Sequence, residues 1–127
     1  MKLKVCGMRD EENIKEVAAI GIDYMGFIFF EGSSRNVTAS IPKLPSGQKS
    51  VGVFVNASFD TIVEKINTHN LQAVQLHGEE TPKFCKSLQA LNTTMNAIDN
   101  KCKGVTTPFL MPLTIFLEFR YWKLLNN

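Results

Sequence analysis

Four short apolar segments recur along the chain, and each is a continuous run rather than an alternation of apolar and polar positions. They are residues 3–6, 24–30, 50–55 and 72–76. Strands with this pattern are covered on both faces, which is typical of a parallel sheet. Their starts lie about 20 to 26 residues apart, the spacing of successive strand–helix units. The pattern therefore predicts four parallel strands.

Three of the intervening segments carry the apolar spacing of amphipathic helices. Apolar side chains recur at helical intervals within residues 11–21, 59–66 and 82–91. Each segment follows a side chain that can cap a helix N-terminus, namely Asp10, Ser58 and Thr81. Pro82 is a residue favoured at the first helical position. The remaining connection, residues 31–48, is rich in Gly, Ser and Pro, which predicts a loop with at most a short helix.

This order of elements narrows the fold to two α/β classes. Right-handed crossovers between parallel strands build either an open doubly wound sheet or part of a (β/α)8 barrel, and the periodicity leaves that choice open. After residue 91 the pattern ends. Residues 92–127 hold two acidic residues, whereas residues 1–91 hold ten. We therefore divide the chain into residues 1–91, built of strand–helix units, and an atypical tail, residues 92–127.

Composition and charge exclude several classes of protein. A chain of 127 residues with 44% apolar and 20% charged residues suits one globular domain. It has no run of about 18 apolar residues for a membrane helix, and its N-terminus lacks the apolar core of a signal peptide. The net charge of +2 comes without a basic stripe, so nucleic-acid binding is not expected. Three cysteines without a short spacing predict free thiols and a cytoplasmic location.

Reactive and polar side chains follow the ends of the predicted strands. Because the carboxyl ends of parallel strands meet at one edge, Cys6, Arg35, Gln75 and His77 are expected at a common rim. Cys6 is a candidate thiolate base, and Lys4, on the same face of its strand, can supply the positive neighbour that a thiolate needs. Arg35 is a candidate fork for a carboxylate or phosphate. His77 is a candidate polar group lining the site.

Each candidate also has a structural explanation. Cysteine is often a small core residue, loop arginines are commonly solvated, and most histidines satisfy local hydrogen bonds. No metal site is expected, because His69 and His77 are eight residues apart and no CxxC or HxxxH spacing occurs. No glycine-rich phosphate motif is present either, so no nucleotide cofactor is expected.

Four motifs together resemble the phosphoribosylanthranilate isomerase family. They are Lys4-Val5-Cys6-Gly7-Met8-Arg9, Gly26-Phe27-Ile28-Phe29 with Ser33-Ser34-Arg35-Asn36, Val51-Gly52-Val53-Phe54-Val55-Asn56, and Gln75-Leu76-His77-Gly78-Glu79-Glu80. The resemblance covers residues 1 to about 91 and implies the first half of a TIM-type (β/α)8 barrel. It also implies an isomerase of tryptophan biosynthesis that needs no cofactor. Such an enzyme performs the Amadori rearrangement of N-(5-phosphoribosyl)anthranilate, a phosphosugar–anthranilate substrate.

The resemblance implies a role for each candidate side chain. Cys6 falls on the family's base, which removes the C2′ proton, and Arg35 falls on the anchor of the anthranilate carboxylate. Gln75 and His77 match substrate-binding side chains at the family's fourth strand. An aspartic acid after the sixth strand, in an Asp-Thr pair, protonates the furanose ring oxygen. The reaction needs both groups because one donates a proton while the other accepts one.

The tail departs from this family. Residues 92–127 contain no apolar run that ends in Asp-Thr, and the phosphate-binding loops of the last two strands are missing. A smaller departure is Ser34, where the family usually has proline. We expect impaired isomerase activity, since loss of a general acid costs on the order of 10²–10⁴ in rate. The change in composition further predicts that the tail derives from a shifted reading frame or an altered 3′ end.

Two alternative functions belong to other classes. Four strands cannot close a barrel, so the first and fourth strands are expected to have unpaired outer edges. A non-catalytic half-barrel would then self-associate through those edges. The second alternative is a small-molecule module that binds a phosphosugar without turnover.

Overall fold

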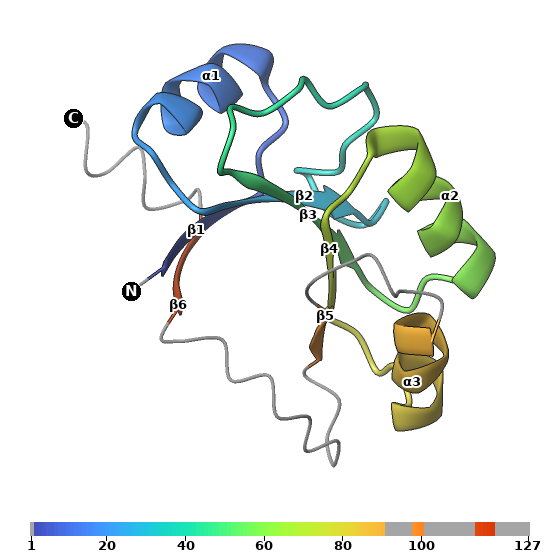
Figure 1. Cartoon of the computed structure of the whole chain (residues 1–127). Helices are drawn as coiled ribbons and strands as arrows, with labels where there is room; N and C mark the ends of the chain where they lie inside the picture. The colour runs from blue at the N-terminus through green and yellow to red at the C-terminus, as the bar shows by residue number, and fades with distance from the viewer. Residues whose placement is uncertain (1, 91–97, 101–113, 119–127) are drawn as a thin grey trace.

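A six-stranded sheet in which all paired strands are parallel forms the centre of the molecule (Figure 1). The computed structural model describes residues 2–90, 98–100 and 114–118. The strand order is β5-β4-β3-β2-β1-β6. The strands are β1 (Lys2–Cys6), β2 (Tyr24–Phe29), β3 (Lys49–Phe54), β4 (Ala73–Leu76), β5 (Ile98–Asn100) and β6 (Thr114–Glu118).

Three helices cover the convex face of the curved sheet, as Figure 1 shows. They are α1 (Glu11–Ala19), α2 (Phe59–His69) and α3 (Pro82–Ala90). Each helix connects two strands that are neighbours in the sheet. Between β2 and β3, the loop 30–48 takes the place of a helix. This is the βα arrangement of a barrel that is not closed by the described strands.

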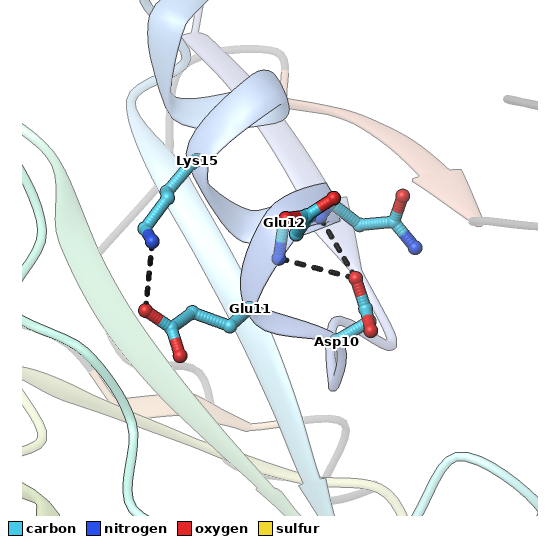
Figure 2. A network of polar contacts seen from close by, with 5 residues as sticks. Asp10, Glu11, Glu12 and Lys15 are labelled. Carbon is cyan, nitrogen blue, oxygen red and sulfur yellow. Dashed lines mark hydrogen bonds and ion pairs between the residues drawn. The ribbon is translucent and has the colours of Figure 1, made fainter.

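The start of α1 is fixed by its own side chains (Figure 2). The Asp10 carboxylate accepts hydrogen bonds from the backbone N–H groups of Glu12 and Asn13, both at 3.1 Å. One turn on, Lys15 Nζ lies 2.8 Å from a carboxylate oxygen of Glu11. The hydrogen bond and charge of Glu11 raise the pKa of Lys15. The cap satisfies amide donors that otherwise have no partner in a first helical turn, and α1 begins five residues after β1 ends.

The hydrophobic core lies between the sheet and its helices. One cluster joins α1 to the outward-facing residues of β1 and β2, and Val17, Met25 and Phe27 are fully buried in it. A second joins α2 and α3 to β3 and β4 around Phe54 and Ile62. A third, smaller cluster lies on the opposite, inner face of the sheet and consists of Tyr24, Val51 and Ala73. Burial on both faces explains the continuous apolar runs in the sequence.

Most of the predicted elements are confirmed. All four strands agree with the observed ones to within one residue at each end, and the segment 31–48 contains no helix. Ser58 Oγ accepts from Thr61 N at 3.2 Å and Thr81 Oγ1 from Phe84 N at 3.2 Å, so both predicted caps are in place. Among the described helices, none is long and apolar enough to cross a membrane.

Two expectations are wrong. Strands β1 and β4 are not the edges of the sheet, because β6 pairs along β1 and β5 along β4. Within the segment predicted as an atypical tail, β5 pairs with β4 in the place of a fifth strand. Backbone hydrogen bonds to the neighbouring strand hold a strand of three residues, so β5 needs no apolar pattern in its own sequence. Finally, Cys85 is disulfide-bonded rather than a free thiol. The rest of the predicted tail lies outside the described residues.

Candidate functional site

The carboxyl end of β1 places Cys6 on the inner face of the sheet. Its in-register partner on β2 is Gly26, and a Cβ built on Gly26 would lie 2.6 Å from Cys6 Sγ. The sulfur therefore rests directly over the backbone of β2. The N–H groups of Gly7 and Met8 both donate to the Gly26 carbonyl, at 3.0 and 3.1 Å. These bonds hold the turn after Cys6, and Gly7 adopts a φ of +83° that favours glycine.

Arg35 reaches the same point from the loop that follows β2. A Cβ on Gly7 would lie 2.5 Å from Arg35 Nη1 and 2.9 Å from its Cδ, so the Arg35 side chain packs against the turn that follows Cys6. The loop is fixed by two bonds: Val37 N donates to the Ile28 carbonyl at 2.8 Å, and Arg35 N donates to Ser33 Oγ at 3.1 Å. The backbone of this loop thus holds Arg35 against the turn that follows Cys6.

The Arg35 guanidinium carries a buried donor without a partner. Nη1 is excluded from solvent, and no described residue accepts a hydrogen bond from it. A buried, unpaired charged donor is costly, and such groups are normally matched by an anion or a carbonyl oxygen. A carboxylate is the group that best fits the planar fork of arginine.

A buried lysine lies behind Cys6. Lys4 precedes Cys6 by two residues on β1, so the two side chains share the inner face, and Lys4 is only 3% exposed. Its Nζ donates to Oε1 of Gln75 on β4, across the inner face of the two strands between them. The Gln75 side chain is therefore held by the ammonium group of Lys4. The shared parity of Lys4 and Cys6 along one strand is the sequence signal that marks Lys4 as a candidate member of the site.

The end of β4 is fastened to the end of β3 by a clasp, which we define as Asn56, Gly78, Glu79 and Glu80. The two carboxylate oxygens of Glu80 accept from Asn56 N and Gly78 N, each at 2.8 Å. Asn56, at a left-handed φ of 50°, accepts from Glu79 N through its side-chain oxygen at 2.7 Å. Sequence reasoning missed the clasp, although all four residues belong to the motifs that it singled out.

His77 sits at the head of this clasp. Its N–H donates to the Phe54 carbonyl at 2.9 Å, which continues the β3–β4 pairing by one residue. Its side chain is exposed, and within the described part of the chain it makes no hydrogen bond. The structure thus places Arg35 against the turn that follows Cys6 and links Gln75 to Lys4, whereas His77 makes no hydrogen bond to the other candidates. Among the described residues, no group of three His, Cys, Asp or Glu side chains is placed to hold a metal ion.

Comparison with known proteins decides the family. The family model described as N-(5'phosphoribosyl)anthranilate (PRA) isomerase matches residues 3–103 of the chain. The chain belongs to this isomerase family. The match continues past residue 91 and includes β5.

Members of this isomerase family are similar to the chain over its first part. The isomerase of Parabacteroides distasonis is 46% identical over 99 residues, which cover 70% of this chain and 43% of that protein. The isomerase of Phocaeicola vulgatus is 47% identical over 90 residues, 71% of this chain and 44% of that protein. The chain therefore spans less than half the length of these curated relatives.

Solved structures of phosphoribosylanthranilate isomerases share the fold. One, solved in complex with reduced 1-(o-carboxyphenylamino)-1-deoxyribulose 5-phosphate, is 31% identical with a TM-score of 0.65, over 72% of this chain and 50% of that one. Another is a monomeric form of the dimeric isomerase from Thermotoga maritima, 30% identical with a TM-score of 0.62, over 71% of this chain and 48% of that one. The (β/α)8 barrel family is thereby confirmed, with this sheet as part of a barrel.

Proposed function

We propose that this chain carries the base and the carboxylate anchor of phosphoribosylanthranilate isomerisation. The buried, unpartnered Nη1 of Arg35, packed against the turn that follows Cys6, is the observation that supports it. An anionic ligand that pairs with Arg35 comes to lie beside the thiol. A ligand with a carboxylate at one end and an acidic C–H bond next to it matches that pair of groups. The family's substrate is such a molecule.

In the proposed reaction, Arg35 grips the anthranilate carboxylate and Cys6 moves a proton. Once the sugar ring has opened to the Schiff base, the Cys6 thiolate takes the proton from C2′. The electron pair of that C–H bond forms the C1′–C2′ double bond of an enolamine, and Cys6 becomes a thiol. A proton delivered to C1′ and loss of the 2′-hydroxyl proton then give the ketone. Lys4 and Gln75 lie on the same inner face of the sheet as Cys6.

We further propose that turnover by this chain is impaired. The sequence has no counterpart of the acid that opens the ring, since Asp99 and Glu118 do not match the family's Asp-Thr motif. Without that acid, we expect a rate lower by a factor on the order of 10²–10⁴. Binding of the anthranilate end depends on Arg35 and is expected to remain.

The test separates binding from turnover. Calorimetry with anthranilate and with a reduced, non-reacting substrate analogue measures binding by the parent chain and by Arg35→Lys. We expect heat with the parent and a loss of affinity of about tenfold or more in Arg35→Lys, which keeps the charge but not the planar fork. Equal affinity of the two proteins removes Arg35 from the site, and an absence of heat with either ligand refutes the proposal. Assay of the parent against a full-length relative measures the impairment.

A second candidate function is self-association as a half-barrel without catalysis. The observation that favours it is the open sheet, in which β5 and β6 each have one strand neighbour among the described strands. The outer backbone groups of a terminal strand are ready to pair with another chain. Sedimentation equilibrium tests this directly, and a monomer at all concentrations would exclude it. The two candidates predict different outcomes, because ligand binding by a monomer supports the isomerase proposal alone.

A further inference from the structure

We propose that Gly26 is a positioning residue for Cys6: the absence of a side chain at Gly26 sets the place of the sulfur beside Arg35. This inference rests on the proposed function of Cys6 and Arg35 and adds a residue to it. In the proposed site, Gly26 itself does not contact the ligand. It acts through the thiol that lies over it.

Three contacts join Gly26 to the end of β1. A Cβ at Gly26 would meet Cys6 Sγ at 2.6 Å and Cys6 Cα and Cβ at 3.1 Å. The Gly26 carbonyl also accepts both amide bonds of the turn after Cys6. The glycine backbone thus fixes the turn from one side while leaving room for the sulfur on the other. Steric room is the reason for glycine here, since Gly26 is not among the residues with positive φ.

The direction in which the sulfur leans matters for the site. Gly26 is on β2, and the loop that follows β2 delivers Arg35. By resting over Gly26, Cys6 Sγ lies on the side of β1 from which the guanidinium approaches. A methyl group at this position leaves the thiol the alternative of another staggered rotamer, which moves the sulfur by roughly 3 Å. Displacement of a reacting group by even 1 Å can lower a rate by about 100-fold.

A strand glycine on β3 provides a matched control. A Cβ on Gly52 would meet Leu71 Cδ1 at 2.5 Å and Phe54 Cε2 at 2.8 Å, both in the core behind the sheet. Gly52→Ala is thus the same substitution in a neighbouring strand, with a nearest side-chain atom at a similar distance. It disturbs the packing of the domain without approaching Cys6. The comparison separates a general loss of stability from a displaced thiol.

The experiment measures how an Arg35-bound ligand protects Cys6 from alkylation. Parent, Gly26→Ala and Gly52→Ala are treated with iodoacetamide with and without saturating anthranilate, and labelling of the Cys6 peptide is followed by mass spectrometry. Calorimetry gives the anthranilate affinity of each protein. We expect anthranilate to slow labelling about fivefold or more in the parent and in Gly52→Ala, and less than about twofold in Gly26→Ala at unchanged affinity. Equal protection in the parent and in Gly26→Ala overturns the inference.

A second measurement stands without any ligand. The loss of thermal stability caused by Gly26→Ala is compared in the parent and in a Cys6→Ala background. If the methyl group meets the sulfur, removing the sulfur makes the loss smaller. An identical loss in both backgrounds overturns the inference even where Gly26→Ala is too unstable for labelling. Failure of anthranilate to bind the parent, by contrast, refutes the proposed function. The role of Gly26 is then decided by the stability measurements in the parent and the Cys6→Ala background alone.

Discussion

The first prediction tests whether the clasp stabilises the carboxyl ends of β3 and β4. Glu80→Gln replaces one of the two carboxylate oxygens by an NH2 group, which is a donor. One of the N–H groups of Asn56 and Gly78, each now bonded at 2.8 Å, then faces another donor. The remaining oxygen loses its charge. The substitution keeps the size of the side chain and changes only its hydrogen bonding.

The size of the effect follows from these two bonds. A hydrogen bond to a charged acceptor contributes about 1.5–3 kcal/mol, and the bond to Asn56 is exposed, which places it at the low end. We expect Glu80→Gln to lower the free energy of unfolding by about 2 kcal/mol. For a domain of this size that corresponds to a fall in Tm of roughly 5–10 °C.

The assay combines thermal unfolding followed by circular dichroism with amide hydrogen exchange. The control is Glu79→Gln, because Glu79 enters the clasp through its N–H, while its exposed carboxylate makes no hydrogen bond within the described part of the chain. We expect faster exchange at Asn56 and Gly78 in Glu80→Gln and unchanged exchange in Glu79→Gln. If both variants lose the same stability, or if the two amides exchange as slowly as before, the clasp does not hold the rim.

Three further predictions test the site and the core. Gly7→Ala should cost about 1–2 kcal/mol for its φ of +83° and should also weaken anthranilate binding, because its methyl group would displace Arg35; calorimetry with intact affinity would contradict this. Phe54→Ala, at a fully buried position, should cost about 3–5 kcal/mol in urea unfolding, whereas Phe30→Ala, at 41% exposure, should cost far less. Burial lowers the pKa of His69, so the unfolded chain takes up this proton more readily and stability should fall as pH drops below about 6.5. His69→Gln should flatten that dependence, and an unchanged slope would exclude His69 as its source.

Local signals sufficed for most of the fold because each depends on few residues. Asp10 caps α1 through two amides within three residues of it, and such a motif is fully contained in the sequence. The runs that form β2 and β3 are apolar because both faces are covered, and that also shows in the sequence. By contrast, β5 has three residues, fewer than a periodicity needs, and its pairing with β4 depends on a partner distant in sequence.

The positions of the candidate side chains in the fold were predictable from the sequence, and their contacts were not. The topology alone places Cys6, Arg35, Gln75 and His77 at one rim, since parallel strands end at the same edge. Whether side chains meet there depends on contacts of single atoms. The contact of Arg35 with Gly7 and the bond of Lys4 to Gln75 join segments 28 and 71 residues apart. No pattern in the chain encodes those distances.

The final prediction concerns the origin of the residues beyond the family match. The match ends at Lys103, and the acidic residues of the chain become sparse over residues 92–127. Because the family match extends past residue 91, we propose that the coding sequence changes frame, or has an altered 3′ end, after residue 103 rather than after residue 91 as first expected. The family's barrel places a strand ending in Asp-Thr about 40 to 50 codons after Gln75, followed by phosphate loops at helix N-termini.

Translation of the same DNA in its other two forward frames past codon 103 tests this proposal. If one of them encodes that strand and those loops, restoring the frame by a single-nucleotide change should give a chain with the missing acid. Its isomerase rate should then exceed that of the present chain by a factor on the order of 10²–10⁴, since a general acid accounts for that much. If neither frame holds the motif, the proposal of a shifted reading frame is wrong.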